Sequence, residues 1–204
     1  MKTNTMKTKK GFTLLELLIV IGILAILSTT VVLVINPAQL LKKARDSQRI
    51  SDLSTMKTAI AYYVTETGSP DIGTVYTAQT YSDVDAVLCT LGAATSTTLV
   101  VDGTGWIPIK FDDLAGGSPI GSLPTDPNKT LINATPGRYY VYLVGSETDF
   151  TFKLVANMES TYYSTGDSGV EENDGGKANG LYEVGTDMTI PVATSATCYA
   201  ATGV

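Results

Sequence analysis

FTLLELLIVIGILAILSTTVVLVI, residues 12–35, is an apolar stretch of 24 residues that contains one charged side chain, Glu16. A helix needs about 20 apolar residues to cross the hydrocarbon core of a bilayer, so this stretch is long enough to span a membrane. Four lysines precede it, and no basic residue follows it before Lys42. Because basic residues remain on the cytoplasmic side, we expect the N-terminus in the cytoplasm and the rest of the chain outside.

A cleaved secretory signal peptide and a plain transmembrane anchor are the two alternatives for this stretch. A secretory signal has an apolar region of about 7–15 residues, followed by a cleavage site of small residues. Here the apolar run is longer, and five further apolar residues follow Ser28-Thr29-Thr30. A plain anchor accounts for the length of the stretch, but it does not account for the residues at its N-terminal border.

The border carries a more specific pattern: a basic pair, a glycine, an aromatic residue and then a glutamate inside the apolar run. Residues 9–16, KKGFTLLE, resemble the processing site of type IV prepilins and type II secretion pseudopilins. In that family a prepilin peptidase cuts after the glycine and methylates the new N-terminal amine. The resemblance assigns the cleavage signal to Lys9, Lys10, Gly11 and Phe12, with cleavage between Gly11 and Phe12 and N-methylation of Phe12.

Glu16 is the residue that a membrane helix accepts least readily. A carboxylate at the bilayer centre costs a few kcal/mol and usually marks a function. Glu16 lies four residues after Phe12, about 6 Å along a helix. The resemblance implies that its carboxylate pairs with the N-terminal amine of a neighbouring subunit during assembly. The alternative is a carboxylate that extends to the lipid headgroups near the end of the helix.

The composition of the 204-residue chain narrows the classes of function. The length suits one compact domain with an appendage. The sequence has no histidine, which excludes an imidazole base or ligand. A net charge of -6 does not provide the basic surface that nucleic-acid binding needs. No nucleophile–base pair or glycine-rich phosphate loop is apparent, so we expect neither an enzyme nor a nucleic-acid partner.

A second helical segment is predicted from Asn36 to about Thr67. Asn36 is a good N-cap and Pro37 suits the first helical turn, although a continuous, kinked helix is the alternative. One apolar face recurs at steps of three and four residues: Leu53, Met56, Ile60, and Tyr63 or Val64. The charged residues between Lys42 and Asp52 are interpreted as a solvated face of an ordinary domain helix or, in a pilin, as a face that also contacts neighbouring helices. Gly68 and Pro70 are stop signals.

Residues 68–204 are rich in glycine, serine and threonine and contain short β-prone runs. Residues 138–144 (RYYVYLV) and 150–156 (FTFKLVA) flank the turn-rich residues 145–149 and predict a β-hairpin. The second run alternates at first, which predicts one buried face and leaves the other free to meet water. Further predicted strands are Leu99–Val101, Leu181–Val184 and Met188–Val192. The expected fold class is α+β: a long N-terminal hydrophobic helix and a C-terminal globular domain with an antiparallel β-sheet.

Two further passages are similar to major pseudopilins. Tyr62-Tyr63 with the following glycine turn resembles their helix end, and Leu123-Pro124-Thr125-Asp126-Pro127 resembles their proline–aspartate–proline passage. Residues between Asp71 and Pro119 have no such counterpart. The resulting domain organisation is a leader at 1–11, a membrane or filament-core helix at 12–35, an amphipathic continuation at 36–67 and an extracytoplasmic β-rich domain at 68–204.

Residues 166–180, GDSGVEENDGGKANG, form an acidic, glycine-rich loop in the predicted outer domain. Asp167, Glu171, Glu172 and Asp174 offer the hard oxygen ligands that calcium prefers, although the spacing is not that of an EF-hand. Some major pseudopilins bind calcium in a comparable loop. The alternative is a solvated acidic loop without metal, so calcium is a candidate ligand and no cofactor is required.

Cys89 and Cys198 are the two cysteines of the chain, and both fall in the part predicted to lie outside the membrane, where disulfides persist. A bond between them would close a long loop and stabilise the domain by up to about 4–5 kcal/mol in the chain-entropy model. The alternative is two unrelated buried thiols.

The first functional hypothesis is a subunit that polymerises into a helical filament: a surface pilus, a secretion pseudopilus or a DNA-uptake filament. The resemblance implies as partners further copies of the chain, prepilin peptidase, an assembly ATPase with its inner-membrane platform, and membrane lipid before assembly. It places the protein in the cytoplasmic membrane and then in a cell-surface or periplasmic filament. The second hypothesis is a membrane-anchored binding module such as a minor pilin or adhesin. In that module Trp106 could stack on a ligand, although a lone tryptophan is more often a core or interface residue.

Overall fold

The computed structural model describes residues 11–74, 78–80, 94–95, 98–128, 140–164, 169–178 and 180–192. The chain divides into two compact units, Met1–Leu40 and Leu41–Val204. The first unit contains the helix α1, and the second contains most of the helix α2 together with a β-sheet.

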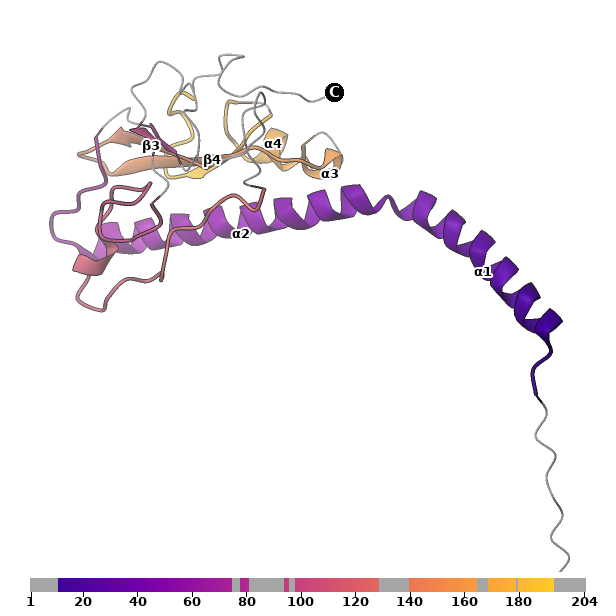
Figure 1. Cartoon of the computed structure of the whole chain (residues 1–204). Helices are drawn as coiled ribbons and strands as arrows, with labels where there is room; N and C mark the ends of the chain where they lie inside the picture. The colour runs from indigo at the N-terminus through magenta and orange to yellow at the C-terminus, as the bar shows by residue number, and fades with distance from the viewer. Residues whose placement is uncertain are drawn as a thin grey trace, which may run out of the picture. The chain divides into compact units, whose positions relative to one another are not determined.

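Helix α1, Leu14–Ile35, is formed by the apolar stretch (Figure 1). Its window Leu14–Val31 has a mean hydropathy of 2.5, and none of that window is buried within the protein. By length and composition, α1 is the one helix in the described part of the chain that is able to cross a membrane. The helix ends at Asn36, whose φ of +44° lies in the left-handed region that asparagine tolerates better than most residues.

Helix α2, Pro37–Glu66, begins immediately after this residue. The Asn36 carbonyl accepts hydrogen bonds from the amides of Gln39 and Leu40, at 3.0 and 3.3 Å. Asn36 therefore ends one helix and caps the next, and the prediction of a second segment starting at Asn36-Pro37 is confirmed. The predicted apolar face of α2 is also confirmed, because its four members are buried: Leu53, Met56, Ile60 and Tyr63.

The β-sheet has five strands in the order β2-β1-β3-β4-β5. The strands are β1 Ala78–Thr80, β2 Ala94–Thr95, β3 Val141–Ser146, β4 Thr151–Ala156 and β5 Tyr182–Gly185. All neighbouring pairs are antiparallel except β1 and β2, which run parallel. The predicted α+β class is confirmed, as are the β3–β4 hairpin and a strand near Leu181–Val184. Three short helices complete the described elements: the 3-10 helix η1 Phe111–Asp113, α3 Thr161–Ser164 and α4 Val170–Asn173.

The predictions of strands at Leu99–Val101 and Met188–Val192 were wrong, because the backbone groups there form hydrogen bonds with loops or with nearby side chains. Leu99 accepts from the amide of Leu123 and Val101 from that of Phe111, so this run has partners in two different segments and forms no ladder. Around Met188–Val192, the Asp187 carboxylate accepts from both the amide and the hydroxyl of Thr189. Such a side-chain bond two residues ahead favours a turn over a strand.

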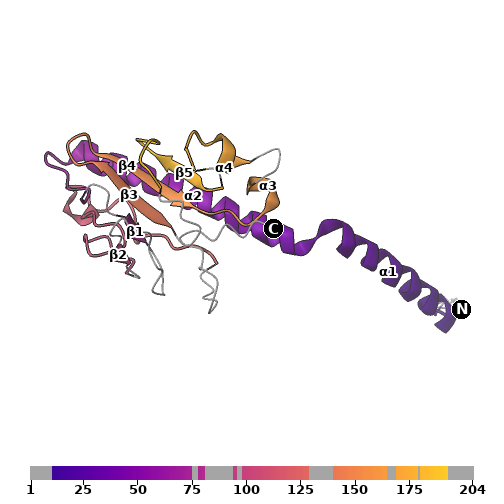
Figure 2. The ribbon, with the colours of Figure 1, turned by 90° about the horizontal axis from the view of Figure 1, so that it is seen from above.

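Both faces of the sheet are buried. Helix α2 lies along one face (Figures 1 and 2), where apolar residues of α2 and the sheet form the main core: Leu53, Met56, Ala59, Ile60, Tyr63, Tyr142, Val144, Phe152, Leu154 and Ala156. A smaller cluster covers the other face: Val141, Leu143, Val155, Ala178, Leu181 and Ile190. The expectation that one face of the second hairpin strand meets water was wrong, and Lys153 on that strand is fully buried.

The segment between Asp71 and Pro119, which has no counterpart in the pseudopilin resemblance, contributes to the main core. Trp106, Ile107, Ile109 and Phe111 are fully buried there. The Trp106 indole donates a hydrogen bond to the Pro124 carbonyl at 3.1 Å. Trp106 is therefore a core residue that fixes the following loop, and the idea that it stacks on an external ligand was wrong.

Candidate processing and assembly site

The Gly11–Phe12 bond lies ahead of α1, outside any helix or strand. A Cβ placed on Gly11 would meet no heavy atom within 4 Å, and the Phe12 side chain is 83% exposed. The backbone around this bond is therefore accessible, as proteolytic processing requires. Lys9 and Lys10 lie outside the described residues.

Thr13 and Glu16 form a reciprocal pair of hydrogen bonds at the start of α1. The Glu16 amide donates to the Thr13 hydroxyl at 3.2 Å, and the Thr13 amide donates to the Glu16 carboxylate at 3.4 Å. This capping box satisfies two amides that a helix N-terminus leaves unpaired. Sequence reasoning missed it, although the threonine three residues before a glutamate is its usual signal.

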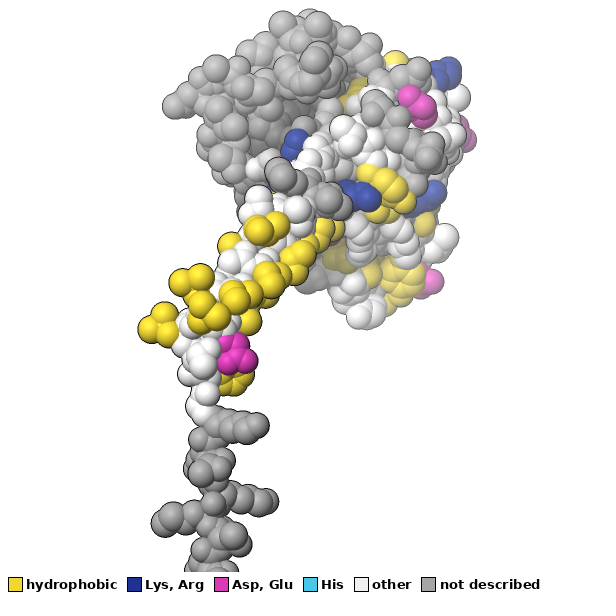
Figure 3. Space-filling model, turned by 90° about the vertical axis from the view of Figure 1, so that its right-hand side faces the viewer, with side chains coloured by type: hydrophobic (Ala, Val, Ile, Leu, Met, Phe, Trp, Pro, Cys, Tyr) yellow, Lys and Arg dark blue, Asp and Glu magenta, His cyan; other side chains and the backbone are white. Residues whose placement is uncertain are grey.

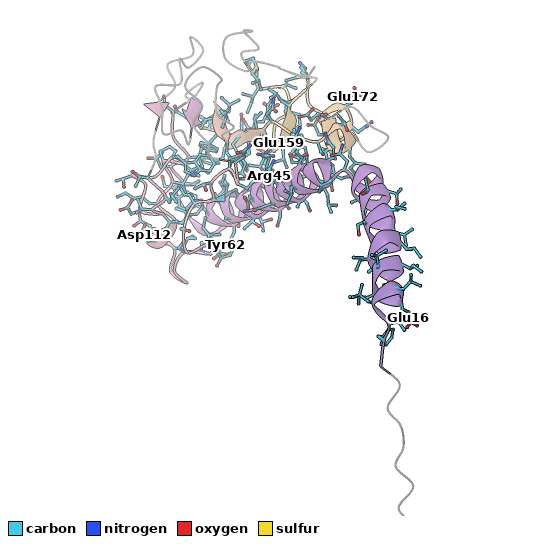
Figure 4. The ribbon with its side chains drawn as sticks, turned by 45° about the vertical axis from the view of Figure 1, so that its right-hand side comes forward. Glu16, Arg45, Tyr62, Asp112, Glu159 and Glu172 are labelled. Atoms are coloured by element: carbon cyan, nitrogen blue, oxygen red, sulfur yellow. The ribbon has the colours of Figure 1, made fainter. Side chains whose placement is uncertain are left out.

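The Glu16 carboxylate is exposed at the beginning of α1 (Figure 4). A negative charge in the first turn is favourable, because the unpaired amides there carry partial positive charge. Glu16 thus has a role within its own subunit. The same carboxylate is also accessible to a group from another molecule.

The surface of α1 is apolar on all sides. Every one of its described side chains is exposed, and hydrophobic side chains cover the side of α1 that Figure 3 shows, with an acidic side chain near its beginning. A helix that is hydrophobic all round is normally found inside a protein core or a membrane. An exposed surface of this kind marks an interaction with lipid or with other proteins.

Residues 6–32 match the family model of the prokaryotic N-terminal methylation motif. The chain carries a prepilin-type signal. This signal is that of type IV pilins and pseudopilins, and it confirms the resemblance inferred from residues 9–16. It implies processing by prepilin peptidase, assembly of a pilus or pseudopilus, and a structural role for the subunit. No curated protein and no solved structure matches the chain.

C-terminal to α1, within the globular unit, a buried ion-pair cluster joins α2 to two loops. Arg49 lies at its centre, and its guanidinium contacts the carboxylates of Asp46 at 2.6 Å, Asp126 at 2.6 Å and Glu159 at 2.5 Å. Burial alone would lower the pKa of Arg49, but the bonds to Asp126 and Glu159 outweigh burial and raise it. Arg45 adds a second guanidinium, at 2.6 Å from Glu159 (Figure 4).

The interpretation of the charged half of α2 as a solvated face was wrong for Asp46 and Arg49, which are fully buried. The Asp46 carboxylate also accepts from the amides of Glu159 and Ser160, at 2.9 and 2.7 Å. The cluster therefore connects α2 to the segment that leads into α3. Sequence periodicity does not show this, because the partners are more than 70 residues away along the chain.

A second polar contact connects α2 with the sheet. The Tyr140 hydroxyl donates to the Asp52 carboxylate at 2.7 Å. Burial raises the pKa of Asp52, although the hydrogen bond from Tyr140 acts in the opposite direction. Burial and the same hydrogen bond raise the pKa of Tyr140, so its hydroxyl remains a donor.

Two of the predicted calcium ligands, Glu171 and Asp174, accept hydrogen bonds from backbone amides of different segments. The buried Glu171 accepts from the Met158 amide at 2.8 Å, and Asp174 accepts from the amides of Glu183 and Gly176 at 2.6 and 2.7 Å. Glu172 is exposed, and Asp167 lies outside the described residues. The described part of the chain contains no group of three or more acidic, cysteine or histidine side chains that could hold a metal ion. Calcium binding stays a prediction from the sequence.

A buried ion pair between Lys153 and Glu183 lies beside the acidic loop 166–180. The Lys153 ammonium pairs with the Glu183 carboxylate at 2.7 Å and donates to the Met188 carbonyl at 3.1 Å, and both side chains of the pair are fully buried. The other Glu183 oxygen accepts from the Ala178 amide at 3.1 Å. Lys153 and Glu183 thus fix the end of the acidic loop to β4 and β5. Cys89 and Cys198 lie outside the described residues, and their disulfide also stays a prediction.

Proposed function

We propose that this protein is a structural subunit of a type IV pilus or of a type II secretion-like pseudopilus. In this proposal the chain is processed between Gly11 and Phe12 and then polymerises through α1 into a helical filament. The proposal is supported by the prepilin-type signal, which overlaps most of a helix that is apolar on every side.

The exposed apolar surface of α1 carries the proposal. In the membrane, lipid covers this surface, and in a filament the α1 helices of neighbouring subunits replace the lipid. The subunit can therefore leave the bilayer without exposing α1 to water. A head-to-tail contact that does not close into a ring then extends the assembly as a helical filament.

Glu16 has a defined role in this proposal. Processing creates a positively charged amine at Phe12, four residues from Glu16. A charge that enters an apolar core needs a partner of opposite sign. The exposed Glu16 carboxylate is available for the amine of a neighbouring subunit, and this pairing would define the axial register between subunits.

The proposed location follows from the same elements. Before assembly, α1 anchors the subunit in the cytoplasmic membrane with the globular unit outside, and afterwards the subunit is part of a cell-surface or periplasmic filament. The proposed partners are further copies of the chain, prepilin peptidase, and an assembly ATPase with its inner-membrane platform. The alternative is a membrane-anchored binding module that does not polymerise as the main subunit.

Intact mass spectrometry of filaments sheared from the source cells tests the proposal. We expect a dominant species that begins at methylated Phe12. A processed species that is present in membranes but absent from filaments would favour a minor or secretion role. A species that retains residues 1–11 in the filament would contradict the proposal.

A matched pair of glycine substitutions strengthens this experiment. Gly11 and Gly22 both have open surroundings, because a Cβ placed at either position would meet no heavy atom within 4 Å. We expect Gly11→Val to retain residues 1–11, because the side chain obstructs the peptidase. Gly22→Val, inside α1, should be processed like the wild type.

A further inference from the structure

Four residues around the beginning of the globular unit combine apolar, basic and aromatic side chains. Leu41, Lys42 and Lys43 belong to the first turns of α2, and Tyr162 belongs to α3, which lies beside them (Figures 1 and 2). We call these four residues the collar. Leu41 is 62% exposed and Tyr162 is 42% exposed, so both side chains are available at the surface.

The collar is arranged around the axis of α2. Successive residues of a helix are turned by about 100° and rise by 1.5 Å, so Leu41, Lys42 and Lys43 point in different directions at nearly the same height. The Lys43 ammonium lies 3.5 Å from the ring centroid of Tyr162, within the range of a cation–π contact. Tyr162 in turn packs edge-to-face on Tyr163. This packing holds the tyrosine next to the lysines.

The charge of the two lysines is not balanced by an ion pair among the described residues. Neither Lys42 nor Lys43 forms an ion pair with any carboxylate in the described ranges. The nearby Glu159 does not cancel their charge, because Arg45 and Arg49 already pair with it. Among the described residues the collar therefore presents two cations, a charge that suits an anionic partner.

The chain connection limits how far Leu41 can lie from the end of α1. The spanning window of α1 ends at Val31, and Leu41 follows ten residues later across the break at Asn36, so the two residues are at most about 20 Å apart whatever the angle between the helices. The headgroup region adds several ångströms to each side of the hydrocarbon core, and long lysine side chains extend towards it. Basic residues, tyrosine and exposed leucine are the side chains that lipid interfaces favour.

We propose that the collar binds the headgroups of anionic phospholipids in the membrane that α1 crosses. This inference rests on the proposed anchoring of the subunit by α1. Its consequence is a second membrane contact, which belongs to the globular unit. That contact must be released when the subunit leaves the bilayer, so the anionic lipid content influences extraction.

The test uses the full chain in nanodiscs with the photoreactive residue p-benzoylphenylalanine in place of Tyr162. One set of discs contains only phosphatidylcholine, and the other contains phosphatidylcholine and phosphatidylglycerol at three to one. After illumination, mass spectrometry measures the yield of lipid adducts. Two lysines at an anionic surface shift the docked population by about thirtyfold, so we expect a several-fold higher yield in the anionic discs.

Charge substitutions on α2 provide the matched comparison. In the same photoreactive chain, Lys42→Gln with Lys43→Gln should remove the excess yield, while Lys57→Gln, on the same helix but outside the collar, should leave it unchanged. Equal yields in the two lipids, equal effects of both sets of substitutions, or adducts to a second copy of the chain would overturn the inference. A chain that does not enter the nanodiscs at all would instead contradict the proposed anchoring.

Discussion

Arg49 in α2 donates two parallel hydrogen bonds to Asp126, 77 positions further along the chain: Nε to Oδ2 at 2.7 Å and Nη2 to Oδ1 at 2.6 Å. Both side chains are fully buried. A guanidinium and a carboxylate in this two-point geometry define orientation as well as distance. The proline–aspartate–proline passage therefore has a physical role here: its aspartate fixes the loop to α2, and its first proline accepts the hydrogen bond from Trp106.

The first prediction concerns this cluster. Arg49→Met leaves the carboxylates of Asp46 and Asp126 buried without their cation, and loss of one partner of a buried pair costs about 3–5 kcal/mol. The loss is measured by thermal unfolding of the detergent-solubilised full chain, followed by the fluorescence of the single, buried Trp106.

Arg45→Met is the matched control for this experiment. The Arg45 side chain is 31% exposed and, among the described residues, forms an ion pair with Glu159 alone, so its loss should cost less than about 1 kcal/mol. Similar losses for the two variants would show that burial of the cluster does not stabilise the attachment of α2.

The second prediction concerns the buried pair of Lys153 and Glu183. Lys153→Met should destabilise the globular unit by about 3–5 kcal/mol, because Glu183 remains buried without a cation. The double variant Lys153→Met with Glu183→Met should lose less than the sum of the two single losses, with a coupling of about 0.5–3 kcal/mol. The exposed Lys110→Met should change the free energy of unfolding by less than about 0.5 kcal/mol. Additive losses for the pair would contradict a direct interaction.

The third prediction is a dependence of stability on pH through Asp52. Because burial raises the pKa of Asp52, the folded protein keeps a proton at pH values where the unfolded chain has released it. Its contribution is therefore present below the unfolded pKa of about 3.9 and is lost as the pH rises through the raised folded pKa.

Asp52→Asn isolates this contribution, because asparagine still offers an oxygen to the Tyr140 hydroxyl but does not titrate. We expect the free energy of unfolding of the wild type, relative to Asp52→Asn, to decrease as the pH rises from about 3 through the raised pKa of Asp52. Denaturant unfolding at several pH values measures the difference. Parallel pH profiles for the two proteins would refute this assignment.

The fourth prediction separates the two roles of Glu16. Glu16→Gln retains the capping box, since glutamine also serves at that position, but removes the charge. An unpaired amine in an apolar core costs several kcal/mol, so we expect at least about tenfold less processed subunit in sheared filaments. Thr13→Ala removes the cap at a cost of about 1 kcal/mol and retains the charge, so filaments should still form. A larger loss of filament subunit in Thr13→Ala than in Glu16→Gln would assign the role of Glu16 to helix capping.

The sequence predicted the parts of the fold that depend on neighbouring residues. The length of the apolar stretch predicts α1, the Asn36-Pro37 pair predicts the start of α2, and two β-prone runs around a turn predict the β3–β4 hairpin. The predictions failed where the structure of a residue depends on a partner that is distant along the chain. Leu99–Val101 looks like a strand, but its backbone bonds to Leu123 and Phe111, and Lys153 looks like a solvent-facing residue, but Glu183 stabilises its charge inside the protein.

The sequence by itself determined the processing signal, the membrane-spanning length of α1 and the unusual position of Glu16, because these properties depend on the order of residues within one short stretch of the chain. Only the tertiary structure decided that Asp46 and Arg49 are buried, that Asp126 is a partner of Arg49 and that Lys43 meets Tyr162. Charged residues on an amphipathic helix have the same local pattern whether they face water or a buried partner. The difference depends on which distant segment packs against them, and that is a property of the folded chain.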